Sequence, residues 1–87
     1  NKHLNKDINL LTDADLAILG SSNEIYTKYI KNIRKEYSIF PDFLYNKGRK
    51  KVLKHFLEMD TIYKTEYFKT RYNEQAIMNL TKEIQTF

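Results

Sequence analysis

Apolar residues in this chain recur at intervals of three and four, and this spacing constrains the fold more than any other feature of the sequence. The clearest run lies near the C-terminus, where five apolar positions are spaced four apart: Phe68, Tyr72, Ala76, Leu80 and Ile84. Side chains at this spacing share one face of an α-helix, whereas those of a half-buried β-strand would alternate. Only two glycines and one proline interrupt the 87 residues, so a hairpin-rich sheet lacks its turns. The pattern predicts an all-α fold.

The periodicity divides the chain into four helices joined by short connections. We expect these helices at about residues 10–19, 24–38, 41–57 and 66–84. Gly20 would end the first helix in a left-handed conformation, and Thr65 is a suitable N-cap for the last. In the third helix we expect Leu44 and Val52 to point inward, and Gly48 to mark close packing or a bend. Residues 1–87 therefore form a small four-helix bundle, which is a single helical domain or a fragment of one.

The composition excludes several classes of protein. Cysteine is absent, so disulfides and thiolate metal sites are excluded. No apolar stretch approaches the roughly 20 residues of a membrane-spanning helix, and no signal peptide opens the sequence. We therefore expect a cytoplasmic protein with no membrane partner. Fifteen Lys and Arg against eleven Asp and Glu give a net charge of +4, which permits anionic partners without requiring them.

The segment TDADLAILG, residues 12–20, sets two carboxylates against an apolar run. Apolar residues surround the axis of this expected helix, so we expect it to be buried. A buried carboxylate is costly unless it is paired, hydrogen-bonded or bound to a metal. Two interpretations follow. In the first, Asp13 caps the helix and Asp15 meets a basic side chain or solvent; in the second, one of the two is a metal ligand.

Together with the segments that follow it, this motif resembles a known family. DADLAILG, YTKYIKNIRKEYS, FPDFLYNKGRKKVLKHFL, IYKTEYF and NEQAIMNLTKEI, in this order, are similar to the C-terminal part of predicted metal-dependent phosphohydrolases of the HD superfamily. The resemblance extends from about Leu11 to Glu83. It implies an all-helical fold and a divalent metal, such as Mn²⁺ or Mg²⁺, held by a histidine, a His-Asp doublet and a later aspartate. Asp13 matches that aspartate, and Asp15 replaces it if the register shifts by two.

The other metal ligands of the family have no counterpart in this sequence. His3 lies in an N-terminal tail and His55 precedes a phenylalanine, so neither forms a His-Asp doublet. Because the sequence opens with Asn1 rather than methionine, we expect a C-terminal fragment of a longer protein that carries one metal ligand of four. A single carboxylate does not hold a cation that needs about six ligands. The fragment alone should bind no metal and be inactive, whereas the intact protein would hydrolyse a phosphorylated small molecule or nucleotide.

The basic segment KGRKK, residues 47–51, is a candidate for holding the substrate phosphate. The guanidinium of Arg49 suits a bidentate contact with phosphate, and Lys50 and Lys51 add charge beside it. Lysines in such a run are also typical of a solvated helix face. In the segment IRKEY, we interpret Arg34 and Glu36 as a structural ion pair beneath the first helix.

Two other classes compete with the phosphohydrolase fragment. One is a small basic helical module that binds nucleic acid through residues 47–54, and the other is a protein-interaction module. Acidic residues soon after this basic run, and the lack of a helix-turn-helix pattern, count against nucleic acid. Without upstream helices the apolar first helix would be partly open to water. We therefore expect a homodimer that buries this helix.

Overall fold

The computed structural model describes the backbone of residues 2–87 and the side chains from residue 8 onward. Its elements are α1 (Lys2–Leu16), the short 3₁₀ helix η1 (Ala17–Gly20), α2 (Asn23–Glu36), α3 (Asp42–Glu58) and α4 (Glu66–Ile84). No strand occurs in this part of the chain, which confirms the prediction of a small all-α bundle. Every helix described is too short or too polar to span a bilayer.

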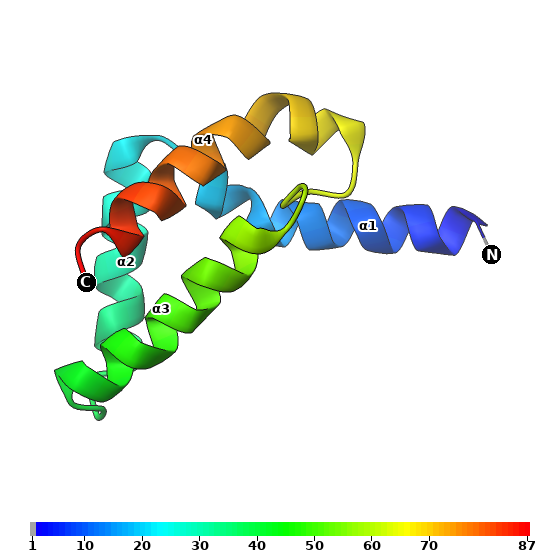
Figure 1. The fold of residues 1–87 in the computed structure, drawn as a ribbon. Coiled ribbons are helices and arrows are strands. Elements are labelled where there is room, and N and C mark those ends of the chain that lie inside the picture. The colour runs from blue at the N-terminus through cyan, green and yellow to red at the C-terminus, as the bar shows by residue number, and fades with distance from the viewer. Residues whose placement is uncertain (1) are drawn as a thin grey trace.

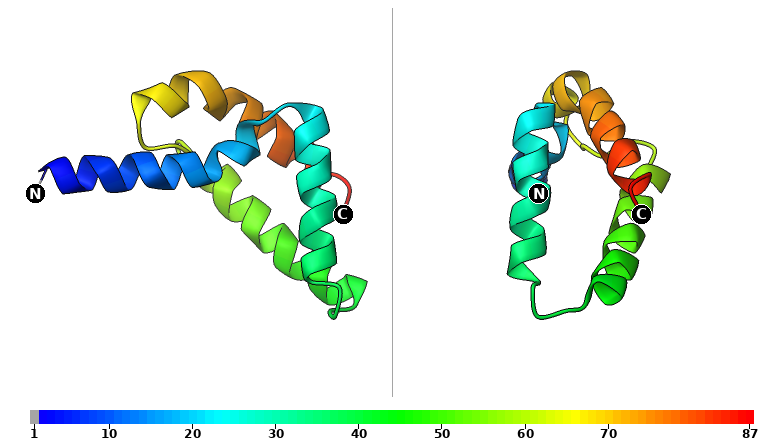
Figure 2. Two further views of the ribbon diagram at one scale, coloured as in Figure 1. Left: turned by 180° about the vertical axis from the view of Figure 1, so that it is seen from behind. Right: turned by 90° about the vertical axis from the view of Figure 1, so that its left-hand side faces the viewer.

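The helices form an elongated molecule of 44 × 23 × 22 Å. α1 extends away from the other helices as a projecting arm (Figure 1). α2 and α3 run in opposite directions from the turn that joins them, and α4 passes the far end of this pair beside η1 (Figure 2). The bundle therefore consists of α2, α3, α4 and η1, with α1 attached at one end.

The helices α2, α3 and α4 begin directly after Ser22, Pro41 and Thr65. Ser22 is the N-cap of α2, where its side chain accepts a hydrogen bond from the Ile25 amide. Pro41 precedes α3 with φ of −64° and Thr65 precedes α4 in an extended conformation. Of these three starts, that of α2 has a side-chain cap, whereas Pro41 and Thr65 make no capping hydrogen bond.

The first helix differs from the prediction. It begins at Lys2 rather than near Leu10, and its last residues continue as η1. Asp13 therefore lies inside the helix and does not cap it. Gly20 is not left-handed, because no described glycine has a positive φ. It is needed for close packing instead: a Cβ at this position would lie 2.6 Å from the backbone oxygen of Tyr72.

The core lies where α2, α3 and α4 meet η1. Its fully buried apolar residues are Leu19, Tyr26, Leu53, Ile62, Tyr63, Ala76 and Leu80. Two of them, Ile62 and Tyr63, come from the connection between α3 and α4, for which the helical periodicity gives no signal. Tyr63 is anchored there by a 2.8 Å hydrogen bond from its hydroxyl to the Leu16 carbonyl.

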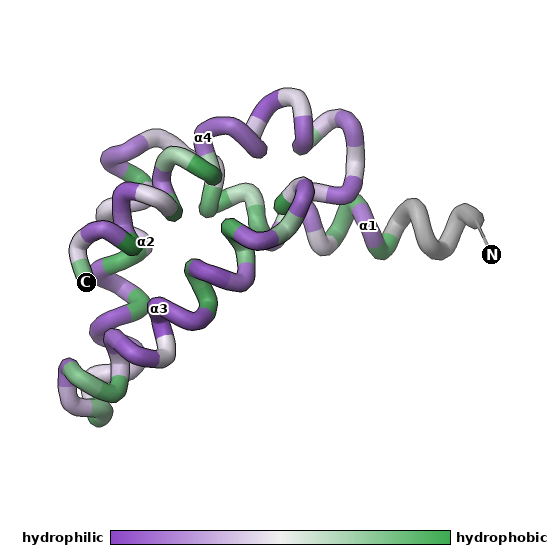
Figure 3. Tube along the Cα trace, viewed as in Figure 1, coloured by the Kyte–Doolittle hydropathy of each residue, from purple (hydrophilic) through white to green (hydrophobic). Residues whose placement is uncertain are grey.

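Several apolar residues lie outside this core, contrary to expectation. Leu44 and Val52 of α3 are exposed, and a Cβ on Gly48 would meet no atom within 4 Å. The prediction that Gly48 marks close packing is therefore wrong. The exposure of Leu10 and Leu11, in contrast, agrees with the expectation that the first helix is partly open to water, because α1 projects beyond the bundle. Apolar residues also gather at the turn between α2 and α3 (Figure 3).

Candidate functional site

Asp13, the first carboxylate of the DAD motif, joins α1 to the start of α4. Its side chain is completely buried. The carboxylate accepts hydrogen bonds from the Lys64 amide at 2.9 and 3.0 Å, from the Thr65 amide at 2.7 Å and from the Thr65 hydroxyl at 2.8 Å. Asp13 thus organises the residues that precede α4. The interpretation of Asp13 as the cap of its own helix is wrong, because its carboxylate binds Lys64 and Thr65, which lie 51 and 52 residues further along the chain.

These contacts keep the Asp13 carboxylate ionised. Burial alone would raise the pKa of Asp13, but the hydrogen bonds from Lys64 and Thr65 outweigh this effect and hold its pKa below the ordinary value. Three of the four hydrogen bonds converge on Oδ2, and Oδ1 accepts one. The negative charge is therefore stabilised by protein donors rather than by water.

Asp15, the second carboxylate, is exposed. Two residues correspond to a rotation of about 200° around a helix axis, so Asp15 and Asp13 lie on nearly opposite sides of α1. Among the described side chains, no three of His, Cys, Asp and Glu are grouped closely enough to hold a metal ion. A divalent cation therefore does not fit these residues alone.

Arg49 and Glu83 form the other buried charged site. Arg49 on α3 donates from Nε to Glu83 Oε2 at 2.7 Å and from Nη2 to Oε1 at 2.9 Å. Tyr26 on α2 donates its hydroxyl to the same carboxylate. The Glu83 side chain thereby connects three helices. Burial opposes the charge on Arg49, but the contact with Glu83 outweighs it and raises the pKa of the guanidinium.

This geometry corrects the interpretation of KGRKK as a phosphate clamp. Arg49 is buried, and two of its nitrogens are bound to Glu83, so it does not present a bidentate fork to a phosphate. Lys50 and Lys51 are exposed on α3. The segment therefore combines one structural arginine with lysines on a solvated helix face.

The prediction that Arg34 forms an ion pair with Glu36 is wrong, because the acidic partner of Arg34 is Asp42. Arg34 Nη2 pairs with Asp42 Oδ1 at 2.7 Å, while Nη1 and Nη2 donate to the carbonyls of Tyr37 and Phe40. Arg34 therefore closes the turn between α2 and α3. This turn lies at the opposite end of α2 from η1, so Arg34 does not lie beneath the first helix (Figure 1).

Sequence reasoning missed two polar residues of α4 that organise the bundle. Glu83 was not identified as the partner of Arg49, although it lies three residues after the core residue Leu80 and so faces inward. Asn79 is also buried, and its amide donates to the carbonyls of Leu19 and Ser21 at 2.9 and 2.8 Å. Each occupies a position between the apolar residues of the predicted stripe. Because Asn79 and Glu83 lie on the inner face of the helix, their position in the stripe was the signal that could have predicted their burial.

Comparisons with known proteins give no relative for this chain. No family model matches it, and neither a curated protein nor a solved structure matches it significantly. The relationship to the HD superfamily is therefore a hypothesis carried by the sequence motifs.

Proposed function

We propose that this chain is the C-terminal helical part of an HD-type metal-dependent phosphohydrolase, to which it contributes Asp15 as the carboxylate ligand. The observation that carries the proposal is an open strip on α1 formed by Ile8, Leu11 and Asp15. Spacings of three and four put these side chains on one face, and Leu11 is 67% exposed. An apolar strip that ends in a carboxylate is suited to packing against upstream helices that bring further ligands.

The two aspartates have different roles in this proposal. Asp13 fixes α1 on the loop before α4 and is saturated by Lys64 and Thr65. Asp15 lies on the other side of α1, where a cation bound by upstream residues would be accessible to it. Such a cation polarises a phosphoryl oxygen and activates water when it is bound. In this proposal the described residues supply one metal ligand, Asp15, and Asp13 fixes the orientation of the helix that carries it.

The test uses the longer protein encoded by the reading frame that includes the upstream region. We expect that protein to bind Mn²⁺ in calorimetric titrations and to hydrolyse p-nitrophenyl phosphate. Asp15→Asn should abolish Mn²⁺ binding and leave the melting temperature unchanged, because Asp15 is exposed. Asp13→Asn should lower the melting temperature, because its buried hydrogen bonds are lost. The exposed Asp60 provides the matched control, Asp60→Asn, which should affect neither property.

Two results would overturn the proposal. One is an upstream region that encodes no histidine and no His-Asp doublet. The other is an Asp15→Asn protein whose Mn²⁺ affinity equals that of the Asp60→Asn control.

Exposed lysines on α3 support a second candidate function, nucleic-acid binding. Lys47, Lys50, Lys51 and Lys54 are all exposed and form one stripe along the helix. If the four neutralise phosphates, affinity for random duplex DNA should fall about a hundredfold between 50 and 200 mM salt, roughly as expected for four contacts. Fluorescence anisotropy measures this slope. Binding that is absent at the lower salt concentration excludes the candidate.

A further inference from the structure

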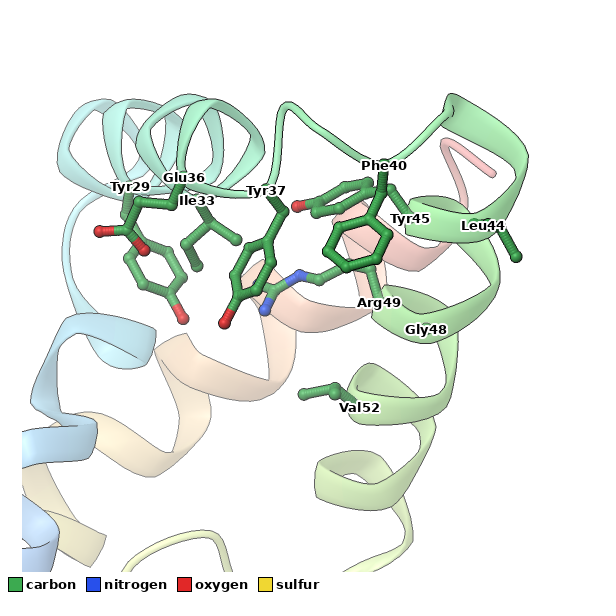
Figure 4. A pocket seen from close by; sticks show the side chains of 10 residues that line it. All are labelled: Tyr29, Ile33, Glu36, Tyr37, Phe40, Leu44, Tyr45, Gly48, Arg49 and Val52. Atoms are coloured by element: carbon green, nitrogen blue, oxygen red, sulfur yellow. The ribbon is translucent and has the colours of Figure 1, made fainter.

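A cavity of about 610 Å³ lies between α2 and α3 on the side toward their connecting turn. Its walls are mainly aromatic and aliphatic, and the residues that line it are Tyr29, Ile33, Glu36, Tyr37, Phe40, Leu44, Tyr45, Gly48, Arg49 and Val52 (Figure 4). This volume lies within the range of about 300–1,000 Å³ that is usual for small-molecule sites. The cavity also explains why Leu44 and Val52 are exposed, since they form its outer wall rather than part of the core.

Hydrogen-bond donors gather on one side of this cavity. Arg49 uses Nε and Nη2 to hold Glu83, and its contact with the Tyr29 hydroxyl also raises the pKa of the guanidinium. The hydroxyls of Tyr29 and Tyr37 point toward the same region as the guanidinium (Figure 4). The Tyr29 ring lies 5.5 Å from Arg49 Cζ, which fixes the guanidinium in place. The polar side of the cavity is therefore preorganised.

The electrostatic balance of the cavity disfavours a charged ligand. The positive charge of Arg49 is compensated by Glu83, which is buried beside it. Glu36 is the acidic residue that lines the cavity, and it is exposed at its edge. An anion in the cavity would gain little from Arg49, whose charge is neutralised by Glu83, and would be repelled by the carboxylate of Glu36. A cation would have to displace water from beside the guanidinium.

We infer that the cavity between α2 and α3 binds a flat, uncharged aromatic molecule that carries a hydrogen-bond acceptor at one edge. The rings of Tyr37, Phe40 and Tyr45 offer surfaces for stacking, and the hydroxyls of Tyr29 and Tyr37, which lie beside Arg49, offer donors to the acceptor edge. A bicyclic heteroaromatic carbonyl compound has this chemistry. The site lies at the opposite end of α2 from η1 and α1, and the inference does not rest on the proposed phosphohydrolase function.

Coumarin is a suitable probe, because it is flat, uncharged and has a carbonyl at one edge. Its counterpart 1,2-dihydronaphthalene has a similar bicyclic shape without an acceptor. Titration of the ¹⁵N-labelled chain, followed by two-dimensional NMR, should shift amide resonances of residues around the cavity with saturation. We expect coumarin to bind about three- to tenfold more tightly than the hydrocarbon, the ratio expected for one net hydrogen bond.

Two tyrosine variants test the donors without removing a ring. Tyr37→Phe removes a hydroxyl at the cavity and should lower coumarin affinity about three- to tenfold, with affinity for the hydrocarbon unchanged. Tyr67→Phe is the matched control, because Tyr67 is exposed on α4 and does not line the cavity. It should leave both affinities unchanged. Val52→Glu at the mouth should abolish binding, whereas Met78→Glu on the exposed side of α4 should not.

Three results would overturn the inference. The first is an absence of saturable shifts at the cavity with coumarin up to about 5 mM, the range in which a fragment of this size binds a suitable site. The second is equal affinity for coumarin and 1,2-dihydronaphthalene, or tighter binding of 2-naphthoate than of coumarin. The third is a concentration-dependent shift of the Ile39 and Phe43 amides without any probe, which would show that these exposed side chains of a second copy occupy the cavity.

Discussion

Arg49 on α3 and Glu83 on α4 are 34 residues apart in the sequence and are joined by two hydrogen bonds, of 2.7 and 2.9 Å. Both side chains are more than nine-tenths buried. The carboxylate also accepts a hydrogen bond from Tyr26, so the pair fixes the relative positions of α2, α3 and α4. An arginine that sequence alone suggests for phosphate binding therefore has a structural role in this fold.

Removing Arg49 should be severely destabilising. Arg49→Met leaves the buried Glu83 carboxylate without its cation, and breaking one partner of a buried pair costs about 3–5 kcal/mol. For a domain of this size that loss approaches the whole stability. Urea unfolding followed by circular dichroism measures the change.

The double variant Arg49→Met with Glu83→Leu provides the control. It removes both charges together, so it should be more stable than Arg49→Met alone. Asp42→Asn, which breaks the exposed pair with Arg34, should cost less than about 1 kcal/mol. A double variant that is less stable than the single one would contradict the assignment of Arg49 and Glu83 as a coupled pair.

The Asp13 carboxylate should make stability depend on pH in the acid range. Its pKa is lower in the folded protein than in the unfolded chain, so the unfolded chain takes up protons first. The contribution of Asp13 is fully present above the unfolded pKa of about 4 and is lost as pH falls through the folded value. Asp13→Asn should cost about 2 kcal/mol or more at neutral pH, because its amide group opposes the donors of Lys64 and Thr65.

The measurement is urea unfolding of the wild-type chain and the Asp13→Asn variant from neutral pH into the acid range. The difference between their free energies of unfolding should narrow as pH falls below about 4. Asp15→Asn should not change the free energy of unfolding at neutral pH, because Asp15 is exposed. If the difference in free energy of unfolding between the wild-type chain and Asp13→Asn is the same at every pH, Asp13 stabilises the fold by packing rather than by its negative charge.

Residues with strong local preferences were the predictable part of this fold. The stripe from Phe68 to Ile84 predicted α4, and Ser22 caps the start of α2, because periodicity and capping act within a few residues. The start of α1 was missed, because residues 2–9 contain two apolar residues, Leu4 and Ile8, which are too few to establish a period. That Asp13 is buried was expected, but its partners were not, since Lys64 and Thr65 lie more than 50 residues away.

The candidate site was less predictable, for the same physical reason. The charge of Arg49 is visible in the sequence, but its burial depends on where α4 crosses α3. Arg34 illustrates the same limit: Asp42, beyond the turn, is its partner rather than the nearby Glu36. Spacing along one helix determines which residues share a face. It does not determine which face of a neighbouring helix they meet.

The two glycines should respond to alanine in opposite directions. A Cβ on Gly20 would lie 2.6 Å from Tyr72 O and 2.8 Å from Tyr72 Cβ, and neither backbone nor Cβ can move aside easily. Gly20→Ala should therefore cost about 1–3 kcal/mol or more. A Cβ on Gly48 would meet no atom within 4 Å inside a regular helix, so Gly48→Ala should stabilise the chain by about 0.5–1 kcal/mol.

Thermal unfolding of both glycine variants checks this prediction. The melting temperature should fall for Gly20→Ala and rise for Gly48→Ala. A Gly20→Ala chain as stable as the wild type would mean that η1 and α4 are not packed as closely as described.

The projecting arm α1 should cause the chain to self-associate. Ile8, Leu10 and Leu11 are exposed on α1, and contiguous apolar surface of this kind is rarely left open in soluble monomers. We expect a twofold dimer through this helix. Leu11→Glu should make the chain monomeric without lowering its melting temperature, because Leu11 lies outside the core. Leu16 is less suitable for this test, since it packs against the core.

Size-exclusion chromatography with light scattering distinguishes the outcomes. Ile77→Glu, an exposed position on α4, is the matched control and should leave the dimer intact. Under the proposed function, upstream helices would cover the same face of α1 in a longer protein, and Leu11→Glu there should disturb folding or metal binding rather than association. A wild-type chain that stays monomeric at high micromolar concentration, and behaves like its Leu11→Glu variant, would show that the α1 surface is stable in water and needs no partner.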